Sequence, residues 1–208
     1  LDRSTSMQSI AKQAVDHFNE QRDQAIQNAK DQNITLSLVT FNGEVYEHDW
    51  LVPAEELAQA DRDSYQPSGS TAWYDALGFT IDKLIATTDQ DDPDTAYLVI
   101  SISDGEENSS SHYGNQYDPS IINGLIKERT ATGKWTFTYM GCSEANIREV
   151  ARATGISPSN MAMWTNESEK GAARSLNRAT QRYDAYYSCR TRGVTSSDNM
   201  YSDQLGMA

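Results

Sequence analysis

The sequence predicts a three-layer α/β domain: a mostly parallel central sheet with one antiparallel edge strand, and helices on both faces of the sheet. Helical and strand-like segments alternate along the chain. Residues 96–103 (AYLVISIS) form an uncharged and mostly apolar run, which is typical of a strand covered on both faces. Asn42-Gly43 stands between two strand-like runs and predicts a hairpin turn, because both residues tolerate positive φ. This hairpin supplies the antiparallel edge strand.

The first half of the chain is predicted to contain two long helices and the hairpin. Over residues 7–30, the side chains of Ile10, Ala14, Phe18 and Ala25 fall near one face of a helix. The other segments expected in this half are strands at 34–41 and 44–50, a short helix opening at Pro53, a loop at 65–71 and a helix at 72–87.

In the second half of the chain, capping residues predict where the helices begin and end. Asp118-Pro119 is an N-cap followed by a proline at the first helical position, and this helix is expected to end at Gly133. Ser143 is expected to cap a helix that ends near Gly155. The other segments expected are strands at 135–140 and 160–164, a long amphipathic helix at roughly 167–188, and a loose polar stretch from Gly193.

Length and charge limit the classes of protein. The chain has 208 residues, which suits one α/β domain over residues 1–190 followed by a polar C-terminal tail over residues 191–208. The formal net charge of -13 argues against nucleic acid and anionic membranes as partners, because no dense basic stripe is available to neutralise phosphates. No run of about 18 apolar residues predicts a membrane-spanning helix.

The cysteines and the first residues bear on the location of the protein. Cys142 and Cys189 lack the spacing of a disulfide framework or of a metal site, so we interpret them as reduced thiols in a cytoplasmic protein. A single disulfide in a secreted protein is the less favoured interpretation, and a virion-associated location is a further alternative. Residues 1–4 (LDRS) do not have the character of a signal peptide.

Three separated loops are rich in small, oxygen-bearing side chains. They are residues 2–7 (DRSTSM), 68–71 (SGST) and 103–108 (SDGEEN). Each loop follows a predicted strand or opens a predicted helix, and ligands of open α/β sheets gather beyond the carboxyl ends of the strands. We therefore expect the three loops to meet at one edge of the sheet.

The side chains of these loops form a hard, all-oxygen donor set. Two carboxylates and three hydroxyls are the ligands that Mg²⁺, Mn²⁺ and Ca²⁺ prefer. The predicted metal site consists of Asp2, Ser4, Ser6, Thr71 and Asp104.

The motifs DxSxS, GST and SDG, in this order and at these separations, resemble the von Willebrand factor type A family and its metal-ion-dependent adhesion site. The segments LDRSTSMQSI, TFNGEV, GSTAWYDAL, SDGEENSS and GKWTFTYMGCSEANI are similar to a bacterial or phage branch of that family. Any one motif alone is a weak signal. The three together are specific, and the resemblance covers about residues 1–190.

The resemblance implies a role for each residue of the site. Ser4 and Ser6 would bind the metal through their hydroxyls, and Thr71 would bind it directly in one state of the site. Asp2 and Asp104 would act directly or through water and would orient the hydroxyl ligands. The implied cofactor is a divalent cation, Mg²⁺ foremost with Mn²⁺ and Ca²⁺ as alternatives. Neutral hydroxyls leave positive charge on the metal, so an open coordination position would receive an Asp or Glu carboxylate of a partner protein.

Two features depart from the family pattern. In the family the central strand runs directly into the first aspartate, whereas here Leu1 alone precedes Asp2. A parallel sheet without its middle strand would leave rows of unpaired backbone groups. We therefore expect apolar residues upstream in the parent protein, or a segment of a partner, to fill the place. Thr5 stands where many relatives have glycine, and its stiffer side chain alters the bend of the loop.

Simpler interpretations compete with the site. Asp2 could belong to an N-cap cluster, Thr71 could cap the helix that follows it, and Asp104-Gly105 could be a plain turn. The agreement of the three loops favours the metal site.

Residues near the motifs receive simpler predictions. Solvated loop positions are expected for Glu106, Glu107 and Asn108, and surface positions for His17 and His48.

The function predicted from the sequence is metal-dependent protein binding without catalysis. The sequence contains no His-Glu-x-x-His, Gly-x-Ser-x-Gly or phosphate-loop motif. A metal-dependent hydrolase that activates a water is one alternative. A structural or assembly protein with a vestigial site is the other.

Overall fold

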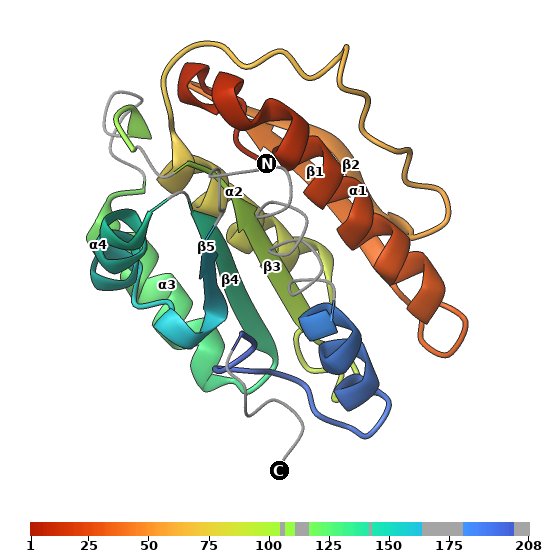
Figure 1. The fold of residues 1–208 in the computed structure, drawn as a ribbon. Helices are drawn as coiled ribbons and strands as arrows, with labels where there is room; N and C mark the ends of the chain where they lie inside the picture. Colours follow the sequence, from red (N-terminus) through yellow and green to blue (C-terminus); the bar gives the residue numbers. More distant parts are fainter. Residues whose placement is uncertain (105–106, 111–116, 142, 164–180, 202–208) are drawn as a thin grey trace.

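The computed structural model describes residues 1–104, 107–110, 117–141, 143–163 and 181–201 (Figure 1). The elements in chain order are η1 (Thr5–Ile10), α1 (Ala11–Asn28), β1 (Thr35–Phe41), β2 (Val45–Pro53), α2 (Trp73–Thr87), β3 (Tyr97–Ile102), α3 (Pro119–Ala131), β4 (Trp135–Gly141), α4 (Glu144–Thr154), η3 (Pro158–Asn160) and β5 (Met161–Met163). Residues 181–190 are also helical. Within these described ranges, no helix has the length and apolar character needed to cross a membrane.

The strands form two separate sheets, and the fold is mixed α/β as predicted. Strands β1 and β2 are an antiparallel hairpin, with Phe41 opposite Val45. Strands β3, β4 and β5 form a parallel sheet in that order, with Tyr97 opposite Trp135 and Tyr139 opposite Met161. A middle strand before Asp2 is missing from residues 1–208, as noted from the sequence, and among the described residues the two sheets are joined through residues 1–3, where Asp2 bridges to Phe41 in parallel.

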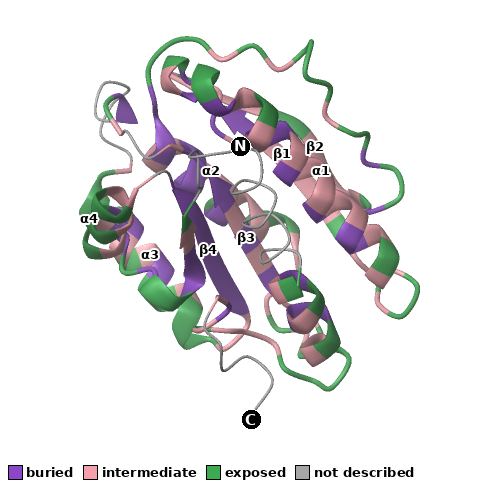
Figure 2. Cartoon of the chain, viewed as in Figure 1, coloured by how far each residue is buried: buried purple, intermediate pink, exposed green. Residues whose placement is uncertain are grey.

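Two apolar cores lie against opposite faces of β3 and β4. Odd-numbered side chains such as Val99 and Phe137 join a core with α2, α3 and α4. Even-numbered side chains such as Ile102 and Met140 join a second core with α1 and the segment 181–190. This alternation follows from the two-residue period of a strand. All seven residues of β4 are buried (Figure 2).

The helix signals in the second half are confirmed. The Asp118 carboxylate accepts a hydrogen bond from the Ile121 amide at 2.8 Å, which caps α3. The Ser143 hydroxyl accepts from the Asn146 amide at 3.2 Å and caps α4. Gly155 ends α4 with a φ of 74°, a left-handed conformation that glycine adopts without steric cost.

Two predictions for the first half of the chain differ from the structure. The helix predicted from Pro53 does not form, because Pro53 is the last residue of β2 and a turn follows it. Farther along, the Asn19 side chain donates to the Ala60 carbonyl and accepts from the Ala60 amide, which fixes the path of this segment. His17 is fully buried on α1 rather than at the surface, because α1 is covered on that side by Tyr183. His48 is exposed, as predicted, and bonds Thr40 at 2.7 Å.

The residues after Gly193 pack onto the domain instead of lying loose. The Ser197 amide donates to Thr136 Oγ1 at 2.9 Å, and the Met200 amide donates to Asn160 Oδ1 at 2.7 Å. The Met200 side chain is fully buried. The first part of the helix predicted at 167–188, Cys142 and residues 202–208 lie outside the described residues, while Cys189 is a free thiol.

Candidate metal centre

The first loop is placed by residues 1–3, which lie between β1 and β3. The Leu1 amino nitrogen donates to the Val39 carbonyl at 2.9 Å, and the Arg3 amide donates to the Phe41 carbonyl at 2.7 Å. On the other side, the Asp2 amide donates to the Ile102 carbonyl at 2.9 Å. These bonds hold Asp2 at the carboxyl ends of both β1 and β3, where the sequence analysis placed it.

The carboxylate of Asp2 organises the loop that follows it. Asp2 is fully buried, and its Oδ1 accepts a hydrogen bond from the Ser4 amide at 2.7 Å. Its Oδ2 accepts from the Ser103 hydroxyl at 2.7 Å. The hydroxyls of Ser4 and Ser6 lie 3.1 Å apart, so the structure brings together Asp2 and both predicted serine ligands.

The second loop is bound to the first and the third by backbone hydrogen bonds. The Thr5 amide donates to the Gly69 carbonyl at 3.0 Å, and the Ser68 amide donates to the Arg3 carbonyl at 2.8 Å. Thr71 is buried, and its amide donates to Asn108 Oδ1 at 2.9 Å. Thr71 is therefore placed at the junction of all three loops.

Glycine is required at one point of this junction. Gly69 has a φ of 81°, and a Cβ there would stand 3.4 Å from the side-chain nitrogen Nδ2 of Asn42. The left-handed backbone conformation favours glycine, and this bend carries the chain into Thr71.

The third loop contributes Asp104, which is half-buried near Asp2. Burial raises the pKa of Asp2, and the negative charge of Asp104 raises it further, while hydrogen bonds from Ser103 and Ser4 oppose the rise. The two acidic groups are thus close enough to repel each other. Gly105 and Glu106 lie outside the described residues.

Burial also affects the neutral and cationic groups beside Asp2. The pKa of the Leu1 amino group falls to about 6, because burial disfavours the charged form more than Asp2 supports it. Burial raises the pKa of Tyr65, and the charges of Asp2 and Asp104 act in the same direction. The Tyr65 hydroxyl therefore stays protonated and donates to the Asp2 carbonyl.

Three contributing residues were missed by sequence reasoning. Ser103 was counted only as part of its loop, and Tyr65 lies 63 positions from Asp2, so no local pattern marks it. Glu107 was predicted to be solvated, but its Oε1 accepts from the amides of Ser109 and Ser110 at 3.0 and 2.9 Å. Its Oε2 accepts from the Tyr74 amide at 3.1 Å, which ties the third loop to the start of α2. An acidic residue two and three positions before a serine pair is the signal that could have indicated this turn.

The donor chemistry fits a divalent cation. Asp2 and Asp104 bring negative charge, and Ser4, Ser6 and Thr71 bring neutral hydroxyls. All five side chains offer oxygen, which is a hard ligand. In the part of the chain that the structure describes, no three His, Cys, Asp or Glu residues gather in a group. A cation at this place would depend on the hydroxyls as much as on the carboxylates.

Comparison with known proteins shows a shared fold. No family model and no curated protein sequence matches the chain. The pilus adhesin SpaC of Lactobacillus rhamnosus GG, in its open conformation, is similar in structure with a TM-score of 0.64 at 14% sequence identity, over 89% of this chain and 29% of that chain. A von Willebrand factor type A protein from Catenulispora acidiphila has a TM-score of 0.49 at 16% identity, over 88% of this chain and 41% of that one. The match therefore spans less than half the length of either protein.

Proposed function

We propose that this chain is a divalent-metal-dependent protein-interaction module with the three-layer fold of a von Willebrand factor type A domain. The observation that carries the proposal is the buried carboxylate of Asp2, which orients Ser4 beside Ser6 and lies near Asp104. Asp104 and Asp2 would balance the charge of the cation, and Ser4, Ser6 and Thr71 would supply its hydroxyl ligands. The structural likeness to a pilus adhesin accords with an interaction role.

The binding chemistry follows from the ligand set. Mg²⁺ is the preferred cation, with Mn²⁺ and Ca²⁺ as alternatives, because the donors are all oxygen. Two carboxylates neutralise a divalent ion only where both are ionised and both contact it. Because most of the proposed ligands are neutral hydroxyls, the bound ion would keep part of its positive charge. The bound cation would therefore attract a carboxylate, and the partner proposed is a protein that presents Asp or Glu at this edge of the sheet.

Calorimetric titration with Mg²⁺, Mn²⁺ and Ca²⁺ tests the metal site. The unmodified chain should bind Mg²⁺, whereas Asp2→Asn and Ser4→Ala should lose at least about tenfold in affinity. Ser9→Ala is the matched control, because Ser9 is an exposed serine of the same 3-10 segment. Equal affinity in all four proteins would show that the cation does not bind here. Circular dichroism confirms that each variant is folded.

A pull-down with and without chelator tests the interaction role. Partners that are recovered with Mg²⁺, lost with chelator and lost with Ser4→Ala support the proposal. A partner retained in chelator and by Ser4→Ala would contradict it. Metal-dependent phosphatase or esterase turnover that disappears in Ser4→Ala would instead identify a hydrolase.

A further inference from the structure

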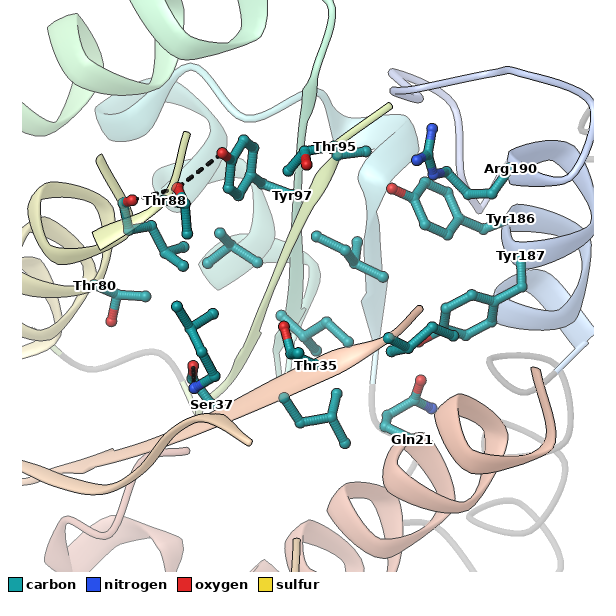
Figure 3. Close-up of a pocket in the computed structure, with 18 of the residues that line it drawn as sticks. Gln21, Thr35, Ser37, Thr80, Thr88, Thr95, Tyr97, Tyr186, Tyr187 and Arg190 are labelled. Atoms are coloured by element: carbon teal, nitrogen blue, oxygen red, sulfur yellow. Dashed lines mark hydrogen bonds between the residues drawn. The ribbon is translucent and has the colours of Figure 1, made fainter. Parts of the chain in front are cut away.

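The hairpin turn at Asn42 and Gly43 lies beyond the end of β1, at the edge of the sheet that carries the candidate site. A groove with a volume of about 870 Å³ lies between β1 and β3, and Figure 3 shows Thr35 of β1 and Tyr97 of β3 along it. Phe41 is the last residue of β1 that lines this groove. The turn is therefore separate from the groove, and its neighbours are the loops of the candidate site.

Asn42 contacts the second loop of the candidate site on both sides of Thr71. The Asn42 side chain donates from Nδ2 to the Ser68 carbonyl at 3.0 Å. The Asn42 carbonyl accepts from the Ala72 amide at 2.6 Å. One residue of the hairpin therefore holds the chain three positions before Thr71 and one position after it.

The other polar groups of Asn42 close the turn itself. Its Oδ1 accepts from the Glu44 amide at 3.1 Å, and its own amide donates to the Glu44 carbonyl at 3.0 Å. Both ends of the side-chain amide are thus bonded, which fixes its orientation. An aspartate in the same place could accept from Glu44 but could not donate to Ser68, because an ionised carboxylate has no hydrogen to give.

Gly43 gives the second loop room to approach the turn. A Cβ at Gly43 would stand 2.6 Å from the hydroxyl oxygen of Ser70, which is too close for a real contact. That oxygen lies 2.7 Å from the hydroxyl of Ser109. Neither Asn42 nor Gly43 has a left-handed φ, so the backbone conformation that favours this pair in tight hairpins is not adopted here. The contacts with the second loop account for both residues.

Thr71 is the predicted metal ligand that these contacts bracket. Its amide donates to Asn108 Oδ1 at 2.9 Å, and its carbonyl accepts from the Asn108 amide at 3.1 Å. The third loop therefore holds Thr71 directly, while Asn42 holds the chain on either side of it. Mg²⁺ requires ligand oxygens at about 2.0–2.1 Å in near-octahedral geometry, so a shift of this loop would displace a hydroxyl from its coordination distance.

We propose that Asn42 is a positioning residue of the candidate metal centre, which sets the place of the Thr71 hydroxyl by holding the second loop at Ser68 and Ala72. Gly43 is part of the same contact because it admits Ser70. The effect on metal affinity rests on the proposed function, whereas the effect on the second loop does not.

Calorimetric titration of Asn42→Asp in the full chain tests the proposal. This variant keeps the acceptor for Glu44 and loses the donor to Ser68. Affinity for Mg²⁺ should fall at least about tenfold. Affinity for Ca²⁺ should fall less, because Ca²⁺ tolerates a more flexible geometry. The added negative charge acts in the opposite direction, so a fall reports lost position. Asn33→Asp, at an exposed asparagine, is the charge-matched control, and Gly43→Ala should weaken Mg²⁺ binding in the same way as Asn42→Asp.

A double-mutant cycle shows whether Asn42 acts through Thr71. Once Thr71→Ala has removed the hydroxyl, Asn42→Asp should lower Mg²⁺ affinity by less than about threefold further. In a Ser6→Ala background its effect should stay at about tenfold, because Ser6 belongs to the first loop. A full further loss in Thr71→Ala would show that Asn42 does not act through Thr71.

Amide exchange without metal separates a failure of this proposal from a failure of the proposed function. Asn42→Asp should speed exchange of the Ser68 and Ala72 amides at least about tenfold, with the Ile126 amide of α3 as an unchanged reference. If the unmodified chain binds Mg²⁺ but Asn42→Asp binds it equally well, the proposal is wrong and the metal site stands. If the unmodified chain binds no Mg²⁺, the proposed function is wrong. Equal exchange at Ser68 and Ala72 in the two proteins would then overturn the role of Asn42 as well.

Discussion

Strand β4 and strand β1 are both central to the architecture but differ in how far they are buried. All seven residues of β4 are buried, whereas only Thr40 and Phe41 of β1 are. Strand β4 has a parallel neighbour on each side and helices on both faces, while β1 has β2 on one side and the groove on the other. The comparison shows that the burial of a strand depends on its neighbours in the sheet as much as on how apolar its own residues are.

The largest expected effect contrasts one side chain from each strand. Phe137→Ala in β4 should lower the free energy of unfolding by about 3–5 kcal/mol, because Phe137 is buried among Trp135 and the helices. Leu36→Ala in β1 should cost less, about 1–2 kcal/mol, since Leu36 is only partly buried. Urea unfolding of both variants measures the contrast. Equal losses would mean that β1 is as tightly packed as β4.

Acid should lower the free energy of unfolding through His17, which is buried on α1. Burial lowers the pKa of His17 to about 3, below its usual value of 6.5, so the unfolded chain binds a proton that the folded chain does not. The folded state should therefore lose roughly 1.4 kcal/mol for each pH unit below about 6.5 through this group. His17→Gln should remove that part of the pH dependence, measured by urea unfolding between pH 7 and 5. His48→Gln, at an exposed histidine, is the matched control variant.

A smaller effect is expected where the third loop meets α2. Glu107→Gln keeps one acceptor oxygen but replaces the other by an amide group, which cannot accept from Tyr74 and Ser110. The loss should be about 1–2 kcal/mol of unfolding free energy. Glu56→Gln, at an exposed glutamate outside the site, should change stability little. If the two variants behave alike in thermal unfolding, Glu107 does not hold the loop to α2.

The smallest expected effect is the pH response of Asp2 in the presence of chelator. Because the pKa of Asp2 is raised in the folded state, the folded chain binds a proton more readily than the unfolded chain. Stability from this group should rise as pH falls through the raised pKa, the opposite sign to His17. The Tm of the unmodified chain minus that of Asp2→Asn should therefore increase on acidification. A difference that decreases would show that hydrogen bonds to the Asp2 carboxylate outweigh its burial.

Local signals predicted much of the fold because their causes are local. The hairpin at Asn42-Gly43, the cap at Asp118 and the left-handed helix end at Gly155 depend on residues within a few positions. The helix predicted from Pro53 failed because distant Asn19 holds that segment in another path. The burial of His17 was missed for the same reason, since the covering Tyr183 lies far along the chain.

By itself, the sequence determined the mixed α/β class, the succession of strands and helices along the chain and the three oxygen-rich loops of the candidate site. Spacing and residue type carry that information, because periodicity and turn chemistry act over short distances. Only the tertiary structure decided that Ser103 and Tyr65 support Asp2 and that Glu107 ties its loop to α2. These features depend on contacts between segments far apart in the chain, and such contacts exist only after the strands are aligned.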